Sequence, residues 1–157
     1  MKIDRAKISQ YLTEITKNTA ELKALLEANR LQPASLELKA AKYILIELAE
    51  GVANVLQHTL AKAQGIAVNG YLDAINKAYR ADIISKDLFH KLKPFLDFRH
   101  SLIHRYWVID DTLLIKNMLG GYQDFFQFVE EIEAYVRKFD SSHENSFPPA
   151  NHSSDVN

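Results

Sequence analysis

The sequence predicts an all-α protein, an up-and-down bundle of four main helices plus a short helix. Apolar residues recur at spacings of three and four through most of residues 8–140, which is the period of a helix with one buried face. No segment alternates with a period of two over a useful length, so strands are not expected. The connections between the long helices are short, which favours antiparallel neighbours in a bundle.

The first three helices are defined by their apolar spacing and by the residues at their ends. The first expected helix carries one apolar stripe, formed by Ile8, Leu12, Ile15, Leu22 and Leu25. Residues 29–33, which include a proline, interrupt this helix. Ser35 is a suitable N-cap for the second helix, which is expected to end before Gly65. The spacing over residues 71–84 predicts a shorter third helix.

Capping residues also bound the two remaining helices. Ser85 caps the fourth helix, and Pro94 inside it predicts a kink or a fresh helix start. Asp110 and Asp111 cap a last long helix, whose apolar stripe continues across two glycines. The stripe consists of Met118, Tyr122, Phe125, Val129, Ile132 and Val136.

A single domain with a tail is the expected organisation. The chain of 157 residues fits one domain that buries one continuous core. From Ser141 onward the sequence turns to Ser, Asn, His and Pro and loses its periodicity. We therefore assign residues 1–140 to the helical bundle and expect residues 141–157 to form a disordered C-terminal tail.

The composition excludes several classes of function. Hydrophobic residues make up 47% of the chain and charged residues 25%, values typical of a soluble globular protein. The net charge of −1 gives no overall attraction to nucleic acid or to an anionic membrane, so such binding requires a local patch. The absence of cysteine excludes disulfides, thiolate zinc sites and a cysteine nucleophile. Neither a signal peptide nor a membrane-spanning segment is recognisable, so a cytoplasmic protein is expected.

The stretch FRHSLIHRYW, residues 98–107, places a cation in the apolar seam of the fourth helix. The seam runs at spacings of four and three through Leu88, Leu92, Phe95, Arg99, Leu102 and Tyr106. A guanidinium that turns toward the bundle without a partner is costly to desolvate. Arg99 therefore extends to solvent, pairs with a carboxylate such as Glu47 or Asp97, or lines a cleft that holds an anion. On a continuous helix Tyr106 projects about 20° from Arg99, at the mouth of that cleft.

Histidines on the fourth helix and polar residues on the second are further candidates for this site. His100 and His104 have the i, i+4 spacing of two metal ligands, but no third ligand is evident and no metal site is expected. On the second helix, three polar side chains project within about 40° of one another beside the apolar face. These are Glu47, Asn54 and His58. This stripe can face the same cleft as Arg99, although a lone histidine such as His58 is more often an interior residue with a hydrogen-bond partner.

The spacing of Arg99, His104 and Tyr106 resembles the Arg-x4-His-x-Tyr signature of HepT-like toxins in the HEPN superfamily. In that signature the arginine is most often followed by asparagine, whereas this chain has His100. The second helix, ELKAAKYILIELAEGVANVLQH, is also similar to the family's second helix, with its glutamate and its Asn-x3-His ending. The matching residues here are Glu47, Asn54 and His58. The resemblance covers residues 1–140 and leaves out the tail.

The resemblance implies a HEPN-like bundle that acts as a metal-independent endoribonuclease without a cofactor. It implies that Arg99 and His104 are catalytic. The supporting positions are His100, Glu47, Asn54 and His58. It also implies a homodimer, in which two Arg/His sets meet across a cleft, acting as the toxin of a type II toxin–antitoxin pair. The antitoxin is an MntA-like minimal nucleotidyltransferase, which in some systems transfers AMP to the tyrosine of the motif, here Tyr106.

The chemistry of these residue types suits RNA cleavage without a metal. Histidine transfers protons near neutral pH, and arginine stays charged and matches two oxygens of an anionic phosphorane. Two other interpretations remain open. In the first, the protein is a non-catalytic helical partner that binds nucleotide or substrate for a minimal nucleotidyltransferase, with Arg99 and His104 holding a phosphate. In the second, the bundle contains a structural ion pair at Arg99 and no functional site.

Overall fold

The computed structural model describes residues 2–144, and these are helical for most of their length. The elements are α1 (Arg5–Glu27), α2 (Leu36–Gln64), α3 (Tyr71–Arg80), α4 (Lys86–His104), a 3-10 helix η1 (Tyr106–Val108), α5 (Asp111–Gly121) and α6 (Gln123–Glu144). No strand occurs in the part of the chain described. The prediction of an all-α bundle is confirmed, with four long helices and two short ones rather than one.

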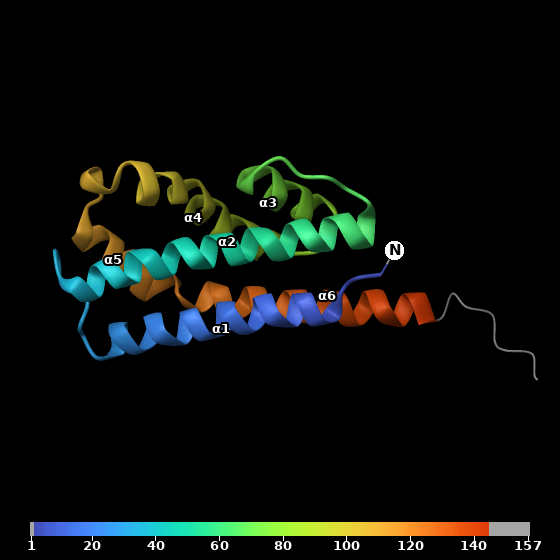
Figure 1. Cartoon of the computed structure of the whole chain (residues 1–157), viewed down its shortest axis with the longest axis horizontal. Coiled ribbons are helices and arrows are strands. Elements are labelled where there is room, and N and C mark those ends of the chain that lie inside the picture. The colour runs from blue at the N-terminus through green and yellow to red at the C-terminus, as the bar shows by residue number, and fades with distance from the viewer. Residues whose placement is uncertain (1, 145–157) are drawn as a thin grey trace, which may run out of the picture.

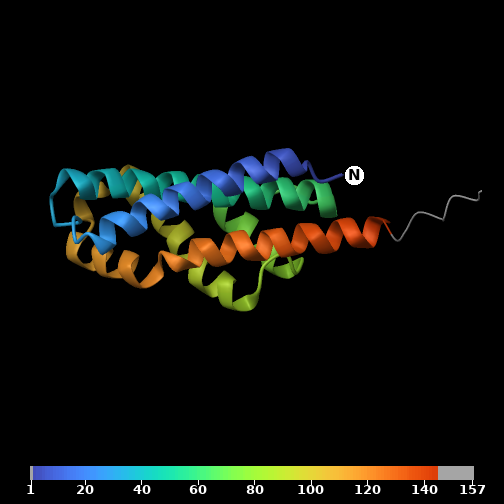
Figure 2. The same ribbon diagram turned by 90° about the horizontal axis from the view of Figure 1, so that it is seen from below.

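Helix α2 is the central helix of the bundle. It packs against α1, α3, α4 and α6, with α1 and α6 on one side and α3 and α4 on the other (Figure 1). The view from below shows α6 running beside α1, with α5 before it at the other end of the bundle (Figure 2). Leu48, Val52 and Leu56 of α2 are completely buried, as its continuous apolar face requires.

The residues predicted to bound the helices have the expected capping geometry. Ser35, Ser85 and Asp110 are N-caps, and the side chain of each accepts a hydrogen bond from the backbone N–H three residues later. Gly65 ends α2 in the left-handed conformation with φ of 64°, where a residue without Cβ is unstrained. These caps fix where α2 and α4 begin. They therefore fix the position of each side chain of these helices along the long axis of the bundle.

Helix α3 is shorter than the predicted 71–84. It ends at Arg80, and Asp82 has a positive φ of 57° that no α-helix accommodates. Ile83 and Ile84 lie in the following turn and are both buried. Their burial continues the apolar spacing past the end of the helix, which is why periodicity alone overestimated its length.

The last helix is also divided, which corrects the prediction of one long helix. α5 ends at Gly121, Tyr122 lies in a turn, and α6 begins at Gln123. Adjacent glycines weaken a helix, and the break follows Gly120 and Gly121 directly. The apolar stripe persists because both pieces pack on the same core.

Two other expectations changed with the structure. α4 is one helix through Pro94, so the fresh start that was one of the two expectations at this proline does not occur. α6 continues to Glu144, so residues 141–144 of the expected tail are helical. The remainder of the expected tail, residues 145–157, lies outside the described residues.

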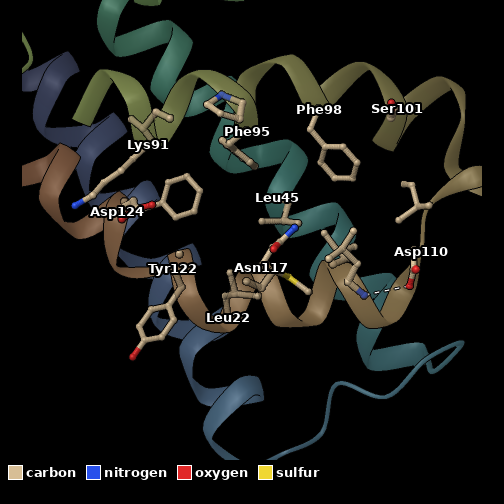
Figure 3. A pocket seen from close by; sticks show the side chains of 18 of the residues that line it. Leu22, Leu45, Lys91, Phe95, Phe98, Ser101, Asp110, Asn117, Tyr122 and Asp124 are labelled. Carbon is tan, nitrogen blue, oxygen red and sulfur yellow. Dashed lines mark hydrogen bonds between the residues drawn. The ribbon is translucent and has the colours of Figure 1, made fainter. Parts of the chain in front are cut away.

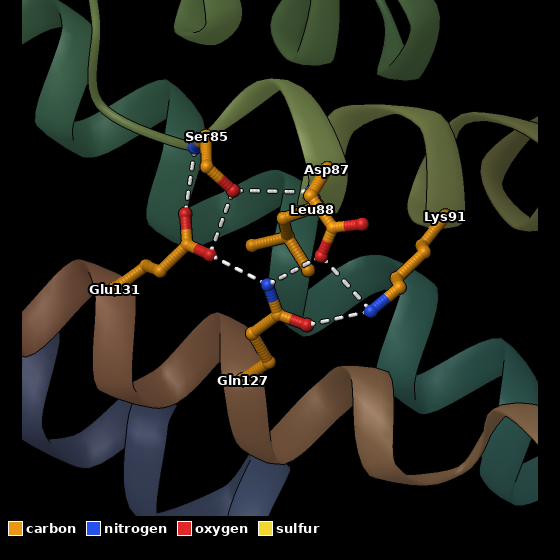
Figure 4. A network of polar contacts seen from close by, with 6 residues as sticks. All are labelled: Ser85, Asp87, Leu88, Lys91, Gln127 and Glu131. Atoms are coloured by element: carbon orange, nitrogen blue, oxygen red, sulfur yellow. Dashed lines mark hydrogen bonds and ion pairs between the residues drawn. The ribbon is translucent and has the colours of Figure 1, made fainter.

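A polar network holds the beginning of α4 against α6 (Figure 4). The backbone N–H and the hydroxyl of Ser85 donate to the two carboxylate oxygens of Glu131, at 2.6 and 2.9 Å. The Gln127 amide donates to Glu131 at 2.8 Å and to Asp87 at 3.1 Å. Lys91 forms an ion pair with Asp87 at 2.9 Å. The hydrogen bond from Lys91 is the main reason why the pKa of Asp87 lies below its ordinary value. The network orients α4 before the motif at its other end begins.

Candidate functional site

Arg99 lies where α4 faces α2 and α3, with its side chain 25% exposed. Its Nη2 lies 3.6 Å from Oε1 of Glu50 on α2. Its guanidinium carbon lies 4.1 Å from the ring centroid of Tyr71, the first residue of α3. We call Arg99, Glu50 and Tyr71 the Arg99 cluster. Three helices therefore meet at the cation that interrupts the seam of α4.

The packing of α2 explains how Glu50 reaches Arg99. The next residue, Gly51, lies against α1, where an added Cβ would meet Cγ1 of Ile15 at 3.0 Å. This close approach of α1 and α2 fixes the rotation of α2 about its axis. Glu50 consequently projects from the flank of α2 that faces α4, and half of its side chain, 51%, remains exposed.

The environment of the Arg99 cluster is partly desolvated. The Nε atom of Arg99 is buried and has no hydrogen-bond partner. Burial also raises the pKa of the Tyr71 hydroxyl, and the positive charge of Arg99 opposes that rise. Glu50 is the charged partner of Arg99, in place of the Glu47 or Asp97 expected from the sequence. The contact with Glu50 is longer than a hydrogen bond and is open to solvent, so it is a weak restraint on the guanidinium.

The two histidines of the motif lie on the outer side of α4. The imidazole centroids of His100 and His104 are 4.7 Å apart, with the rings inclined by 43°. Both side chains are exposed, and His104 is the last residue of α4. Arg99 and His104 are separated by about 140° around the helix axis, so they point in different directions within one chain.

Tyr106 lies beyond the end of α4, which corrects its expected projection about 20° from Arg99. Arg105 leaves the helical conformation with φ of −137°, and Tyr106 begins η1. The Tyr106 side chain is 63% exposed and its ring packs edge-on against Trp107, with centroids 5.4 Å apart. The phenol is therefore accessible to solvent.

The polar stripe of α2 does not converge on Arg99. Glu47 accepts a hydrogen bond of 3.0 Å from the amide of Asn18 on α1, which is buried. His58 accepts a hydrogen bond of 3.2 Å at Nε2 from the backbone N–H of Asp4, the N-cap of α1. Burial first, and then the charge of Lys7, lower the pKa of His58, which favours the neutral acceptor. Glu47 and His58 thus hold α1 in place.

Asn54 has a different position from the other two members of that stripe. It is exposed and lies one helical turn beyond Glu50 on α2. It therefore remains on the flank of α2 that carries the Arg99 cluster. Sequence reasoning missed Glu50 and Tyr71, because local spacing does not show which flank of α2 or which end of α3 faces Arg99.

The described residues contain no metal-binding group of three His, Asp or Glu side chains. The pair of His100 and His104 supplies two nitrogen donors at most. Within residues 2–144 of this chain, these two donors are fewer than the three or four protein ligands of a zinc site.

A separate apolar cavity of about 590 Å³ lies between α4 and α5. Phe95 and Phe98 point into it from α4, with Asn117 of α5 opposite them (Figure 3). At one end lies Asp124, whose pKa is raised by burial while Lys91 opposes the rise. The residues of the Arg99 cluster do not line this cavity, although Phe98 and Ser101 of the 98–107 stretch do, so the cavity is distinct from the Arg99 cluster.

The segment that follows the motif exposes large apolar side chains. Trp107 is 70% exposed, Val108 55%, Leu113 53% and Leu119 60%. Val108 and Leu113 also line the cavity beside α5. We call Trp107, Val108 and Leu113 the η1–α5 apolar surface, because Leu119 projects about 120° away from Leu113 around α5. None of the helices described in residues 2–144 has the length and apolar character needed to cross a membrane.

Comparisons with known proteins agree with this architecture. Residues 8–132 match a family model described as ribonuclease HepT-like. A comparison with curated proteins found no match. Among solved structures, the chain is similar to the cytosolic protein of unknown function YutE from Bacillus subtilis, with a TM-score of 0.74 and 16% identity over 87% of this chain and 92% of that chain. At this identity the likeness shows the shared helical fold alone.

Proposed function

Because this chain belongs to the ribonuclease HepT-like family, we propose that it is a metal-independent endoribonuclease with Arg99 and His104 as its catalytic residues. The observation that carries the proposal is the accessibility of the motif at the end of α4. Arg99 keeps a partly exposed guanidinium whose charged partner is weakly held, and His104 is exposed. The phosphate of an RNA can therefore reach Arg99, and His104 is free to transfer a proton near the same end of α4.

The proposed reaction needs no group beyond RNA and these side chains. The 2′-oxygen attacks the adjacent phosphorus, the bond from phosphorus to the 5′-oxygen breaks, and a 2′,3′-cyclic phosphate and a 5′-hydroxyl remain. One histidine accepts the proton of the 2′-hydroxyl, and another donates a proton to the leaving 5′-oxygen. Arg99 stabilises the negative charge that develops on the phosphorane oxygens.

A homodimer provides the second histidine and brings Arg99 and His104 together across a cleft. Within one chain these two side chains point about 140° apart, which favours a site completed by the partner. The η1–α5 apolar surface follows the motif directly, and large exposed apolar side chains of this kind mark interaction surfaces. His100 lies beside His104, with ring centroids 4.7 Å apart, and is a second imidazole at this end of α4 that can transfer a proton.

We assign the protein to the toxin half of a type II toxin–antitoxin pair that acts in the cytoplasm. The proposed antitoxin is an MntA-like nucleotidyltransferase that transfers AMP to Tyr106. The exposed phenol of Tyr106 on η1 supports this assignment, because a second enzyme can reach it. The added phosphodiester places negative charge and a nucleoside near the site and blocks RNA.

A test of this regulation is co-expression with the nucleotidyltransferase, followed by intact mass and RNA cleavage. The mass should rise by one or more AMP units and the activity should disappear. Tyr106→Phe should prevent the modification, whereas Tyr43→Phe, at another exposed tyrosine, should not. Full silencing of the Tyr106→Phe protein without a mass change would mean that the partner inhibits by binding alone.

The structural interpretation, an ion pair with no site, is less consistent with the geometry. Glu50 is half exposed and lies 3.6 Å from Arg99, and such pairs contribute little to stability. The pair also leaves Nε of Arg99 without a hydrogen bond. A residue retained only for stability would be expected to satisfy its buried donor.

The proposed activity is tested by RNA cleavage with purified protein in the presence of EDTA. Arg99→Ala and His104→Ala should each abolish cleavage while the helical content stays unchanged. Arg105→Ala is the matched control, because Arg105 is an exposed arginine at the same helix end. Loss of cleavage in EDTA with recovery on addition of zinc or manganese would contradict the proposal, as would equal activity of the Arg99→Ala and Arg105→Ala proteins.

A further inference from the structure

Tyr71 is the aromatic partner of Arg99. The guanidinium carbon lies 4.1 Å from the centroid of the Tyr71 ring, within the range of a cation–π contact. The two residues come from different helices, α4 and α3, and are far apart in the sequence. The contact is therefore a product of the tertiary fold.

The position of the Tyr71 ring is fixed from several directions. Gly70 precedes it with φ of 95°, a conformation that residues with a Cβ rarely adopt, and this sets the direction in which α3 begins. The backbone N–H of Asn69 donates to Asp73 at 2.7 Å, and Lys77 donates to the carbonyl of Ala67 at 2.9 Å. Both hydrogen bonds connect the loop before Tyr71 to α3.

The packing of α3 fixes the ring further. Its inner face is fully buried against α2 and α4 through Ala74, Ile75 and Ala78. The start of α3 therefore cannot shift without disturbing the core. Tyr71 consequently presents a rigid aromatic surface to a long and otherwise mobile arginine side chain.

We propose that Tyr71 is a positioning residue that holds the guanidinium plane of Arg99 ready to receive a phosphate. This inference rests on the proposed ribonuclease function. The reason lies in the geometry of a guanidinium, which binds an aromatic ring through its face and binds phosphate oxygens through its edges. Stacking on Tyr71 therefore restrains Arg99 and leaves its hydrogen-bonding edges available.

Glu50 acts on Arg99 in the opposite way. Its carboxylate lies near Nη2, on the edge of the guanidinium that a phosphate needs, and half of its side chain is exposed. An arriving phosphate can replace this loose contact without moving the guanidinium from the ring. The buried Nε belongs to the part of the side chain that is shielded from solvent. The remaining terminal nitrogens are thus the ones that meet the substrate.

The consequences for catalysis are specific. A preoriented guanidinium stabilises the phosphorane without first losing rotamer freedom, so its loss affects the chemical step. Burial raises the pKa of Tyr71, so the ring remains a neutral phenol at neutral pH. Its hydroxyl is not needed for stacking. Phenylalanine should therefore substitute for Tyr71, whereas leucine should not.

The decisive experiment compares Tyr71→Phe, Tyr71→Leu and Tyr79→Leu in steady-state RNA cleavage. Tyr71→Leu should lower kcat by about tenfold or more with a smaller change in KM, and Tyr71→Phe should retain nearly full activity. Tyr79→Leu is the matched control, because Tyr79 also lies on α3 and stacks on Phe89 with ring centroids 4.6 Å apart. It removes an aromatic ring from the same helix without touching the Arg99 cluster.

A second readout does not depend on activity. The Nε–H resonance of Arg99, identified by its loss in Arg99→Lys, should show a ring-current shift in the wild type and in Tyr71→Phe. The shift should vanish in Tyr71→Leu and persist in Tyr79→Leu. If the wild type cleaves RNA, Arg99→Ala is inactive and Tyr71→Leu matches Tyr79→Leu in kcat, the positioning role is overturned. If the wild type does not cleave RNA, the proposed function itself fails.

Discussion

Arg99 shows how a cation is accommodated in an apolar seam. The sequence left three possibilities for this guanidinium, namely extension to solvent, a carboxylate partner or a cleft that holds an anion, and in the structure Glu50 and Tyr71 lie beside it. The partners themselves were not predictable, because which flank of α2 faces α4 depends on the close packing of Gly51 against α1. Glu47, one of the two candidate partners, instead accepts a hydrogen bond from the buried Asn18 on α1.

Replacement of Glu50 by glutamine separates a structural ion pair from a substrate site. Because the pair is exposed and long, Glu50→Gln should change the free energy of unfolding by less than about 0.5 kcal/mol. It should also lower the KM for RNA, since a carboxylate that competes with phosphate is removed. Urea unfolding and steady-state kinetics measure the two effects. Strong destabilisation together with an unchanged KM would favour the purely structural interpretation.

His58 makes stability depend on pH. Its pKa is lowered from 6.5 in the folded protein, chiefly by burial, so the folded state favours the neutral ring that accepts from Asp4. The contribution of this hydrogen bond is therefore complete above pH 6.5 and is lost as the pH falls below that value. Thermal unfolding at several pH values should show the wild type losing stability relative to His58→Gln on acidification. A constant difference between the two proteins would contradict this account.

The helices differ in how well their ends follow from sequence. Ser35, Ser85 and Asp110 have the side-chain chemistry of N-caps, and all three cap a helix. The end of α3 and the break at Tyr122 were missed because buried apolar residues continue past both points. Periodicity reports burial, and burial does not require that the backbone remain helical.

A single side chain connects α5 to the start of α2. Asp111 accepts from Lys42 at 2.9 Å and from the backbone N–H of Ala34 at 3.0 Å, and these two contacts, Lys42 first, lower its pKa. Asp111→Ala should therefore destabilise the protein by about 1–2 kcal/mol in urea unfolding at neutral pH. Asp97→Ala, at an exposed carboxylate of α4, is the control.

The lowered pKa of Asp111 predicts how the destabilisation by Asp111→Ala depends on pH. Because the folded pKa of Asp111 lies below 3.8, its contribution is complete above that pH and disappears as the pH falls through the folded pKa. The difference between the wild type and Asp111→Ala should thus shrink in acid. A difference that grows on acidification would mean that another group accounts for it.

At the scale of the whole molecule, the bundle presents its motif at one end of α4 and an apolar surface directly after it. The fold class and the motif residues were recognisable from sequence, because both depend on local spacing. The Arg99 cluster was not, because it joins α2, α3 and α4 across long stretches of chain. The arrangement of these helices brings Glu50 of α2 close to Arg99, whereas Glu47 and His58 of the same helix form hydrogen bonds with Asn18 of α1 and with its N-cap Asp4.

The η1–α5 apolar surface should form the homodimer interface. Trp107→Asp combined with Leu113→Asp should shift the protein from dimer to monomer in light scattering and reduce RNA cleavage, because a charge in an apolar interface is costly. Leu72→Asp is the control, since Leu72 is 37% exposed on α3, which lies away from α5 (Figure 1). A wild-type protein that is monomeric at micromolar concentration would contradict the composite site.

The chemical ends of the RNA products test the central claim most directly. Attack by the 2′-oxygen, assisted by Arg99 and His104, leaves a 2′,3′-cyclic phosphate and a 5′-hydroxyl, whereas metal-activated water leaves a 5′-phosphate and a 3′-hydroxyl in most nucleases. Mass spectrometry of a short RNA cleaved in EDTA should therefore detect the cyclic phosphate with wild type and with Arg105→Ala, and no product with Arg99→Ala. Products with 5′-phosphate ends, or cleavage that survives loss of Arg99, would contradict the account.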